Sequence, residues 1–186
     1  MTAHHTESKH LTAPVLRDAR EGDVNTLVDL VQVAYRGEGG WTTEAHLVDG
    51  HRTDAAEVHA MIADPAVTLQ VAEIDGELLG CCYTRRESAD DAGITRAELG
   101  LFAVHPSAQS RGLGGRLLEA QAERQRAAGV DVLSIQVLQS RPELHAWYQR
   151  HGFTPTGHSV PFAGNVDWLK VAGLGMDVME RRLHPS

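Results

Sequence analysis

The stretch that decides the fold of this chain is Gln109-Ser110-Arg111-Gly112-Leu113-Gly114-Gly115. An apolar run, residues 97–104, precedes it and predicts a strand, and an amphipathic run follows it and predicts a helix. Closely spaced glycines let a backbone approach an anion, and the first turn of a helix offers unpaired N–H groups. The stretch therefore predicts a phosphate cradle, although ordinary turns also carry short glycine patterns and the signal is weak on its own.

The residues after the cradle continue as alternating helices and strands. The amphipathic helix is expected to end at Gly129, and the apolar residues 132–138 predict a buried strand that lies parallel to the one before the cradle. Pro142 suits the first turn of another helix, which Gly152 ends. Weaker strand candidates follow at residues 153–160 and 175–183.

The N-terminal part of the chain predicts one strand followed by helices. A first strand and a first helix are expected at residues 14–20 and 23–34. Thr42 or Thr43 would cap a second helical region, which Gly50 breaks in two and which ends at Asp64.

A hairpin is expected next, with Asp75-Gly76 as the tight turn between strands at residues 67–74 and 77–83. With the parallel strands around the cradle, the hairpin predicts a mixed sheet that carries helices on its faces. The fold class is therefore α/β or α+β.

Length and composition favour one globular domain. The chain has 186 residues with 42% hydrophobic content, enough for a substantial core over residues 13–186. Residues 1–12 are polar and are expected to form a disordered tail. No uncharged apolar stretch is long enough to cross a bilayer, so no membrane partner is expected.

Charge and cysteine usage narrow the class of partner further. The formal net charge of -8 disfavours a nucleic-acid binder and suits an amine-bearing partner. Cys81 and Cys82 are neighbours in an expected strand and would point to opposite faces, which disfavours a disulfide between them. Free cysteines fit a cytoplasmic location.

Three segments, in this order and spacing, resemble the GNAT N-acetyltransferases. The resemblance implies a GNAT fold, with a mixed, mostly antiparallel sheet of about seven strands that splays between strands four and five. It also implies acetyl-CoA as the acetyl donor, with its pantetheine arm between the splayed strands and its pyrophosphate on the glycine stretch. The segments are residues 97–104, residues 109–114 and residues 146–153.

The resemblance assigns the donor site to the strand and the cradle. Backbone groups of the strand would contact the pantetheine and the acetyl carbonyl, and fixed amides suit an oxygen on which charge develops. The apolar strand side chains would fill the core in either case. The implied coenzyme contacts are Phe102, Ala103, Val104, Gln109, Arg111, Gly112, Leu113, Gly114, Gly115 and Arg116.

Glu98 is the candidate general base. It occupies the position at the strand start where one branch of the family carries that base, and its side chain is expected to share a face with Gly100 and Phe102. Partial burial would raise its pKa and make it a better proton acceptor. The alternative is a carboxylate at the strand edge, exposed or paired with a cation such as Arg96.

Tyr148 is the candidate general acid. It matches the family tyrosine whose phenol hydrogen-bonds the coenzyme sulfur and protonates the departing thiolate, and the alternative is an aromatic packed on Leu144 one turn earlier. This chain differs from the family pattern seven residues before Tyr148. The family often has an asparagine there that binds the pantetheine, whereas this chain has Arg141.

The segment from Tyr35 to Arg52 is expected to form the acceptor wall. Its acidic residues suit an amine, and its basic residues suit a carboxylate, although a solvated surface explains each of them equally well. The histidines nearby have no recognised metal spacing, so no metal is expected. The residues assigned to the acceptor are Arg36, Trp41 and Glu44.

Together these features predict an acetyl-CoA-dependent N-acetyltransferase. Its acceptor would be a primary amine of a small molecule or of a peptide, attacked directly in a ternary complex. The alternative from another class is a non-catalytic acyl-CoA sensor or interaction module that keeps the cradle without turnover. A homodimer is compatible with the sequence, because symmetric dimers are common among soluble proteins.

Overall fold

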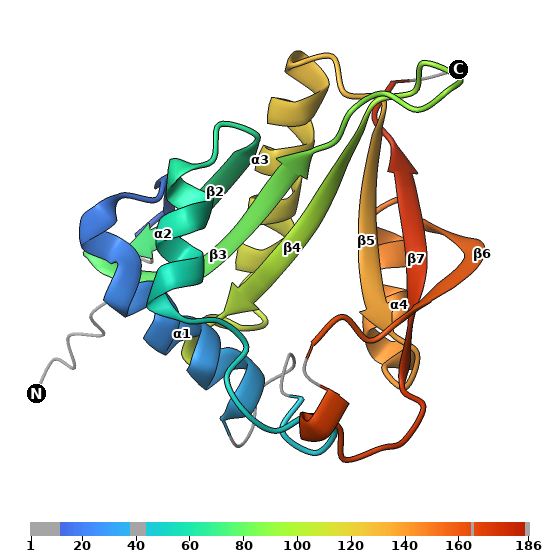
Figure 1. The fold of residues 1–186 in the computed structure, drawn as a ribbon. Helices are drawn as coiled ribbons and strands as arrows, with labels where there is room; N and C mark the ends of the chain where they lie inside the picture. The colour runs from blue at the N-terminus through green and yellow to red at the C-terminus, as the bar shows by residue number, and fades with distance from the viewer. Residues whose placement is uncertain (1–11, 38–43, 165, 185–186) are drawn as a thin grey trace, which may run out of the picture.

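The computed structural model describes residues 12–37, 44–164 and 166–184, so most of the expected N-terminal tail lies outside the described residues. The described strands form one seven-stranded sheet in the order β1-β2-β3-β4-β5-β7-β6 (Figure 1). The strands are β1 (Val15–Asp18), β2 (Val67–Ile74), β3 (Glu77–Arg86), β4 (Arg96–Val104), β5 (Val132–Leu138), β6 (Thr154–Pro161) and β7 (Gly175–Arg182). The helices are α1 (Val24–Arg36), α2 (Ala55–Ala63), α3 (Leu113–Ala127) and α4 (Pro142–Arg150), with short 3₁₀ turns η1 (Glu21–Asp23), η2 (Pro106–Ala108) and η3 (Val166–Trp168).

The predicted mixed sheet is confirmed. β4 and β5 pair in parallel, and every other neighbouring pair of strands is antiparallel. Asp75 and Gly76 both have positive φ, 52° and 82°, as a tight turn between β2 and β3 requires. The strand-helix-strand unit expected around the glycine stretch is therefore β4-α3-β5.

The sheet opens between β4 and β5, as the family resemblance implies. The register pairs only the first residues of β4, Arg96 to Glu98, with Val132 to Ser134 of β5. The two strands then diverge, and Figure 1 shows them close together at the top and well separated at the bottom. From residue 99 to residue 104 one edge of β4 is therefore without a strand partner.

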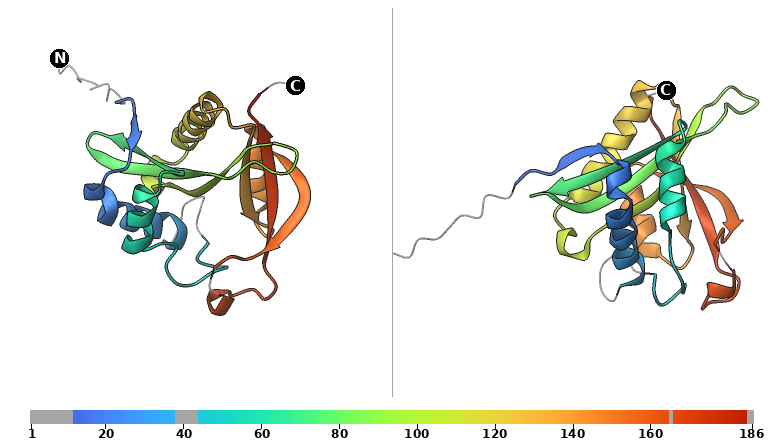
Figure 2. Two further views of the ribbon diagram at one scale, coloured as in Figure 1. Left: turned by 45° about the horizontal axis from the view of Figure 1, so that its top comes forward. Right: turned by 60° about the vertical axis from the view of Figure 1, so that its left-hand side comes forward.

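Helices cover both faces of the sheet. α1 and α2 pack on one face of β2, β3 and β4, and α3 packs on the other (Figure 2). Cys81 belongs to the core under α1 and Cys82 to the core under α3, so the two thiols point to opposite faces as predicted. In the described part of the chain, no helix combines the length and apolar character needed to cross a bilayer.

The prediction for residues 42–64 was wrong in its first half. The helix begins only at α2, where the Asp54 side chain accepts a hydrogen bond from the Glu57 backbone N–H at 2.9 Å. Residues 44–53 form turns and a single bridge, and Gly50 has a left-handed φ of 77°. Thr42 and Thr43 lie outside the described residues.

Tertiary contacts explain why residues 44–50 do not continue as a helix. Val48 bridges Leu169, and Lys170 donates to the Ala45 carbonyl at 2.6 Å. Gly50 lies so close to the Trp168 ring that an added Cβ would sit 2.5 Å from it. These contacts tie the α1 side of the sheet to the β7 side, below the place where β4 and β5 separate.

Candidate active site

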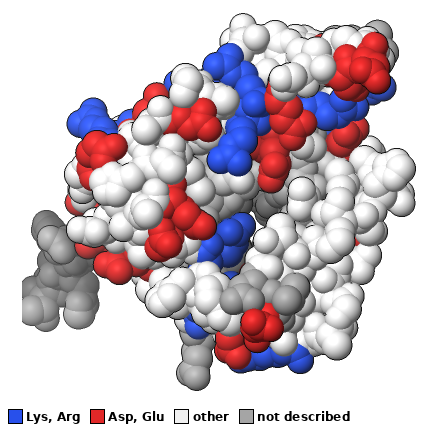
Figure 3. Space-filling model, viewed as in Figure 1, with Lys and Arg blue, Asp and Glu red and all other residues white. Residues whose placement is uncertain are grey.

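A cavity of about 1120 Å³ occupies the opening between β4 and β5. Figure 3 shows a hollow in the middle of this face, with basic and acidic side chains around it. One part of the lining comes from β4, β5, the start of α3 and α4, and the other from α1, residues 44–52, α2 and β3, with further residues from the segments 162–164 and 166–168 and from β7. The cavity therefore joins the expected donor and acceptor regions.

A kink in β4 sets the direction of its side chains. Leu101 has a positive φ of 47°, and the register with β3 shifts between Cys81 and Tyr83. Leu99 and Phe102 both pack under α3 although they are three positions apart, whereas Leu101 packs under α1. Because an undistorted strand alternates strictly, the extra residue at the kink switches the faces.

The kink corrects one expectation about Glu98. Glu98 shares a face with Gly100, but Phe102 lies on the opposite face, under α3. The Phe102 ring crosses the opening to α4, with its centroid 5.7 Å from Trp147 and 6.5 Å from Tyr148. The candidate base and this aromatic contact therefore approach the cavity from different sides of β4.

The glycine stretch forms the N-terminus of α3. Gly112 is the N-cap and has a left-handed φ of 75°, which a glycine adopts without strain. A Cβ at Gly114 would lie 3.4 Å from the Phe102 ring and 3.5 Å from Trp147, and one at Gly115 would lie 3.2 Å from Nε2 of His151. The backbone at the start of this fifteen-residue helix therefore lines the cavity with no side chain at positions 112, 114 and 115.

The expected coenzyme contacts divide into two groups. Seven of them line the cavity, whereas Ala103, Arg111 and Arg116 do not. Ala103 is instead buried under α1, and the two arginines are exposed. The contacts in the lining are Phe102, Val104, Gln109, Gly112, Leu113, Gly114 and Gly115.

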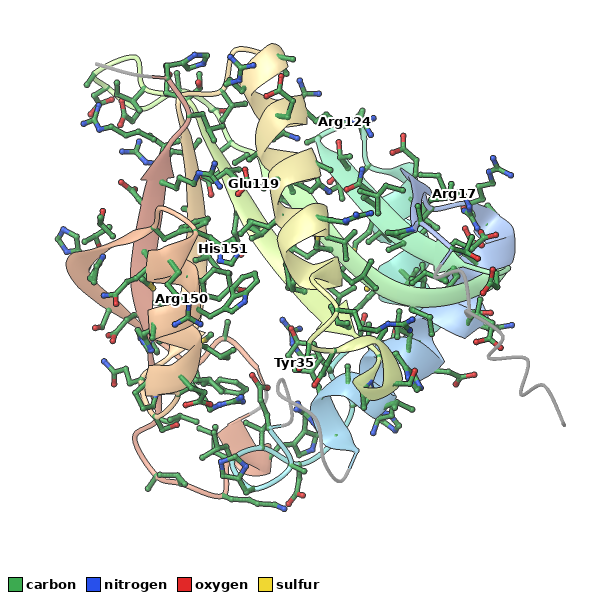
Figure 4. The ribbon with its side chains drawn as sticks, turned by 180° about the vertical axis from the view of Figure 1, so that it is seen from behind. Arg17, Tyr35, Glu119, Arg124, Arg150 and His151 are labelled. Carbon is green, nitrogen blue, oxygen red and sulfur yellow. The ribbon has the colours of Figure 1, made fainter. Side chains whose placement is uncertain are left out.

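The sequence interpretation missed a cation at this end of the cavity. Arg150 lines the cavity from the end of α4, and Figure 4 shows it next to His151 there, with Tyr35 across the site at the end of α1. His151 stacks on Trp147 at a centroid distance of 4.0 Å, and its Nδ1 lies 2.9 Å from the Trp147 carbonyl oxygen. Arg150 lies within residues 146–153, one of the three segments that resemble the family. Its place at the expected end of that helix could have identified it.

Tyr148 lies in an aromatic cluster at the donor end. Its ring centroid is 5.0 Å from Trp147 and 5.5 Å from Phe153, and the residue is only 6% exposed. Burial raises the pKa of the phenol well above its usual value, so the hydroxyl stays protonated at neutral pH. The hydroxyl has no hydrogen-bond partner among the described residues, and Tyr148 lines the cavity.

Arg141 stands where the family often has asparagine, and its side chain interacts with other residues of the protein. It is the N-cap of α4 and is 4% exposed, and its guanidinium pairs with Glu143. Its carbonyl lies 2.8 Å from Nδ1 of His145. Arg141 does not line the cavity.

Side chains donate hydrogen bonds to three backbone carbonyls near the end of β4. The Tyr35 hydroxyl donates to the Phe102 carbonyl at 2.6 Å, and Nε2 of Gln109 donates to the Val104 carbonyl at 3.0 Å. Sγ of Cys81 donates to the Leu101 carbonyl at 3.5 Å. These bonds keep the kinked end of β4 in one conformation next to the cavity.

We expect Tyr35→Phe to lower the free energy of unfolding by about 1 kcal/mol, because it removes one hydrogen bond and leaves the Phe102 carbonyl without its donor. Urea unfolding measures the change. The control is Tyr83→Phe, whose hydroxyl has no hydrogen bond with a described residue and whose loss should cost less. Equal losses in both variants would show that Tyr35 does not hold β4.

Glu98 is half-buried and lines the cavity. Burial raises its pKa most, the Glu87 carboxylate adds to the rise, and Arg85 and Arg52 act in the opposite direction. Arg96, the partner considered from the sequence, pairs with Asp90 and Glu180 instead. Glu98 is thus a carboxylate with raised proton affinity that lines the cavity and has no ion pair within the described ranges.

Two of the three acceptor residues expected from the sequence, Arg36 and Glu44, pair with each other. Nη1 of Arg36 pairs with Oε2 of Glu44 at 3.2 Å, and Nε of Arg36 donates to the Gly50 carbonyl at 2.9 Å. Both charged residues line the cavity, but they neutralise each other and hold residues 44–50 in place. Trp41 lies outside the described residues.

The cysteines offer no nucleophile to this site. Both thiols are buried, and burial raises the pKa of Cys81 to about 12. Neither cysteine lines the cavity. Among the described residues, no three His, Cys, Asp or Glu side chains gather closely enough to hold a metal ion.

A family model for the acetyltransferase (GNAT) domain matches residues 65–155. This range contains β2 to β5, α3 and α4, and so most of the donor side of the cavity. The central part of the chain therefore resembles the GNAT acetyltransferases.

A curated relative agrees with this resemblance. The chain is 30% identical over 100 residues to the mycothiol acetyltransferase of Propionibacterium freudenreichii. The match covers 54% of this chain but spans only 31% of the length of that relative.

Solved GNAT-type structures share the fold. The yncA putative acetyltransferase from Salmonella typhimurium, solved with its cofactor acetyl-CoA, superposes with a TM-score of 0.71 at 18% identity, over 94% of this chain and 96% of that one. The ribosomal-protein-S18-alanine N-acetyltransferase from Escherichia coli has a TM-score of 0.67 at 16% identity, over the same shares of 94% and 96%. At these identities the likeness concerns the fold.

Proposed function

We propose that the protein is an acetyl-CoA-dependent N-acetyltransferase that modifies a primary amine. The observation that carries the proposal is one continuous cavity that reaches from the N-terminus of α3, through the opening between β4 and β5, to Glu98 and the wall formed by residues 44–52. A donor and an acceptor entering from its two ends would meet beside β4.

The donor end has the chemistry that coenzyme A requires. Side-chain-free backbone N–H groups at a helix start suit a pyrophosphate, and Arg150 adds a positive charge at the rim. The aromatic cluster and the unpaired edge of β4 suit the less polar pantetheine arm. Gly112 to Gly115, Phe102 and Val104 would therefore hold the donor, with Gln109 supporting the Val104 carbonyl.

Tyr148 and Glu98 would manage the protons of the reaction. Bound acetyl-CoA supplies the acetyl group as a thioester, whose C–S bond breaks as the C–N bond to the amine forms. Glu98 takes a proton from the attacking amine, directly or through water, and Tyr148 gives its hydroxyl proton to the departing sulfur. The raised pKa values suit both roles, since Glu98 gains basicity and Tyr148 keeps its proton.

We expect Glu98→Gln to lower kcat/KM by about 10²-fold and to remove the acidic limb of its pH profile. In the wild type this limb rises with pH through the pKa of Glu98, above the usual 4.5, because only the carboxylate accepts a proton. Initial rates measured across pH test this. If the rates and the acidic limb of the pH profile are unchanged, water or another group must act as the base.

The same variant should not destabilise the fold. A carboxyl group with a raised pKa in the folded state contributes stability while protonated and loses it as the pH rises through that pKa. At neutral pH, Glu98→Gln should therefore unfold at the same urea concentration as the wild type or at a higher one. A lower midpoint would mean that Glu98 stabilises the fold instead.

Thiol release tests the proposed function as a whole. Purified protein is mixed with acetyl-CoA and a panel of amines, and free coenzyme A and acetylated amine are measured together. Amine-dependent release of both in equal amounts is the expected result. Tight binding of acetyl-CoA with no transfer across a broad panel would instead indicate an acyl-CoA sensor.

A further inference from the structure

The acceptor end of the cavity contains two arginines that form no ion pair with a described carboxylate. Arg52 and Arg85 both line the cavity, and neither forms an ion pair or a hydrogen bond within the described ranges. Each guanidinium lies over a tyrosine ring instead, Arg52 at 5.4 Å from the centroid of Tyr35 and Arg85 at 5.6 Å from that of Tyr83. Stacking of this kind orients the planar group and leaves its N–H edges available.

The other acidic groups of this wall already have donors within the protein. Glu98 is the exception, since it has no hydrogen bond or ion pair with the residues that the structure describes. Glu44 is therefore already ion-paired, whereas Arg52 and Arg85 have no ion-pair partner among the described residues of this wall. The committed pairs are Glu44 with Arg36 at 3.2 Å, Glu57 with the Thr53 hydroxyl at 2.8 Å, and Asp64 with the Ala66 backbone N–H at 2.8 Å.

Both arginines are close enough to Glu98 to act on it. Their charges oppose the rise in the pKa of Glu98 that burial and Glu87 cause, and they oppose the burial-driven rise in the pKa of Tyr83 as well. Tyr83 also lies against Gly100, where an added Cβ would be 2.5 Å from its ring. Arg52, Arg85 and Glu98 thus share one end of the cavity.

We propose that the acceptor is a small amine that carries a carboxylate on the same molecule, as an amino acid does, and that Arg52 and Arg85 bind this carboxylate. Guanidinium groups bind carboxylates through paired N–H···O bonds, and the carboxylate of the acceptor would give Arg52 and Arg85 the ion-pair partner that neither has among the described residues. Its amine then lies toward Glu98. The inference rests on the proposed acetyltransferase function and narrows its acceptor class.

The test compares each amino acid with its own carboxamide, which has the same side chain and amine but no negative charge. Acetylation of both is measured for the wild type, Arg52→Gln, Arg85→Gln and the control Arg86→Gln, an exposed neighbour outside the cavity lining. The panel covers all the common side chains, and a diamine without a carboxylate is included.

We expect the wild type to prefer the best amino acid over its carboxamide at least about tenfold in kcat/KM. Arg52→Gln and Arg85→Gln should each lower kcat/KM for the acid about tenfold and leave the carboxamide nearly unchanged. Arg86→Gln should behave as the wild type. If either arginine had a purely structural role, its replacement would lower kcat/KM equally for the amino acid and for its carboxamide. That result would overturn the proposal.

Three further outcomes would also overturn it. These are equal use of acid and carboxamide, a preference for the diamine, and no turnover of any amino acid by a protein that binds acetyl-CoA. In the first two cases acetyl transfer still occurs, so the proposed function stands while the acceptor class fails. Absence of both acetyl-CoA binding and transfer would mean that the proposed function itself has failed.

Discussion

Replacing Tyr148 with phenylalanine should lower kcat for amine acetylation about a hundredfold, with little change in the affinity for acetyl-CoA. Only the hydroxyl is lost, and it has no hydrogen-bond partner among the described residues. The phenylalanine ring keeps the edge-to-face contacts with Phe102, Trp147 and Phe153. The fall in kcat should therefore come from slower protonation of the departing thiolate and not from altered packing of α4.

Steady-state kinetics with a fixed amine and varied acetyl-CoA separates the two effects. Binding of acetyl-CoA is measured by calorimetry, and thermal unfolding controls for damage to the core around Tyr148. An unchanged kcat would remove the acid role and leave Tyr148 as a packing residue. A lower kcat accompanied by an equal loss of donor affinity would assign it to binding.

Gly114→Asp should weaken acetyl-CoA binding by at least about a hundredfold, because like charges in contact cost several kcal/mol and each factor of ten is about 1.4 kcal/mol. Gly114 lines the cavity in the first turn of α3, where the pyrophosphate is proposed to lie. A new carboxylate there would repel the phosphates. The added Cβ would meet Phe102 and Trp147 only at ordinary contact distances, 3.4 and 3.5 Å.

The fold should survive this change. Gly114 does not have a positive φ, and aspartate is favourable in the first turn of a helix. Gly22→Asp is the matched control, because it adds the same charge where a Cβ meets nothing within 4 Å. If acetyl-CoA binds Gly114→Asp as tightly as it binds the wild type, the glycine stretch is not the phosphate cradle.

The elements of this fold could be predicted where local chemistry decides them. Gly129 and Gly152 both have positive φ, about 80° and 84°, where their helices were expected to end, and Pro142 starts α4. The Asp75-Gly76 turn between two strand candidates predicted the hairpin of β2 and β3. Long-range contacts overrode local preference at residues 44–53, where the pairs formed by Arg36 and Lys170 replace the expected helix.

Sequence patterns predicted more of the residues that line the proposed donor half of the cavity than of those that line the proposed acceptor half. The glycine stretch and Tyr148 follow patterns with fixed spacing, and the structure brings both to one cavity. The kink at Leu101 has no signal in the sequence, since a leucine with positive φ is not expected, and it moved Phe102 to the face opposite Glu98. Arg85 comes from β3 and Arg150 from the end of α4, and only the folded chain shows that both line the same cavity.

A crystal structure of the protein with acetyl-CoA tests the central claim most directly. The account predicts the thioester between β4 and β5, beside Phe102 and within reach of the Tyr148 hydroxyl. The pyrophosphate should lie on the backbone N–H groups of residues 112–115. A coenzyme bound outside the opening between β4 and β5, or with its phosphates away from the start of α3, would contradict the account.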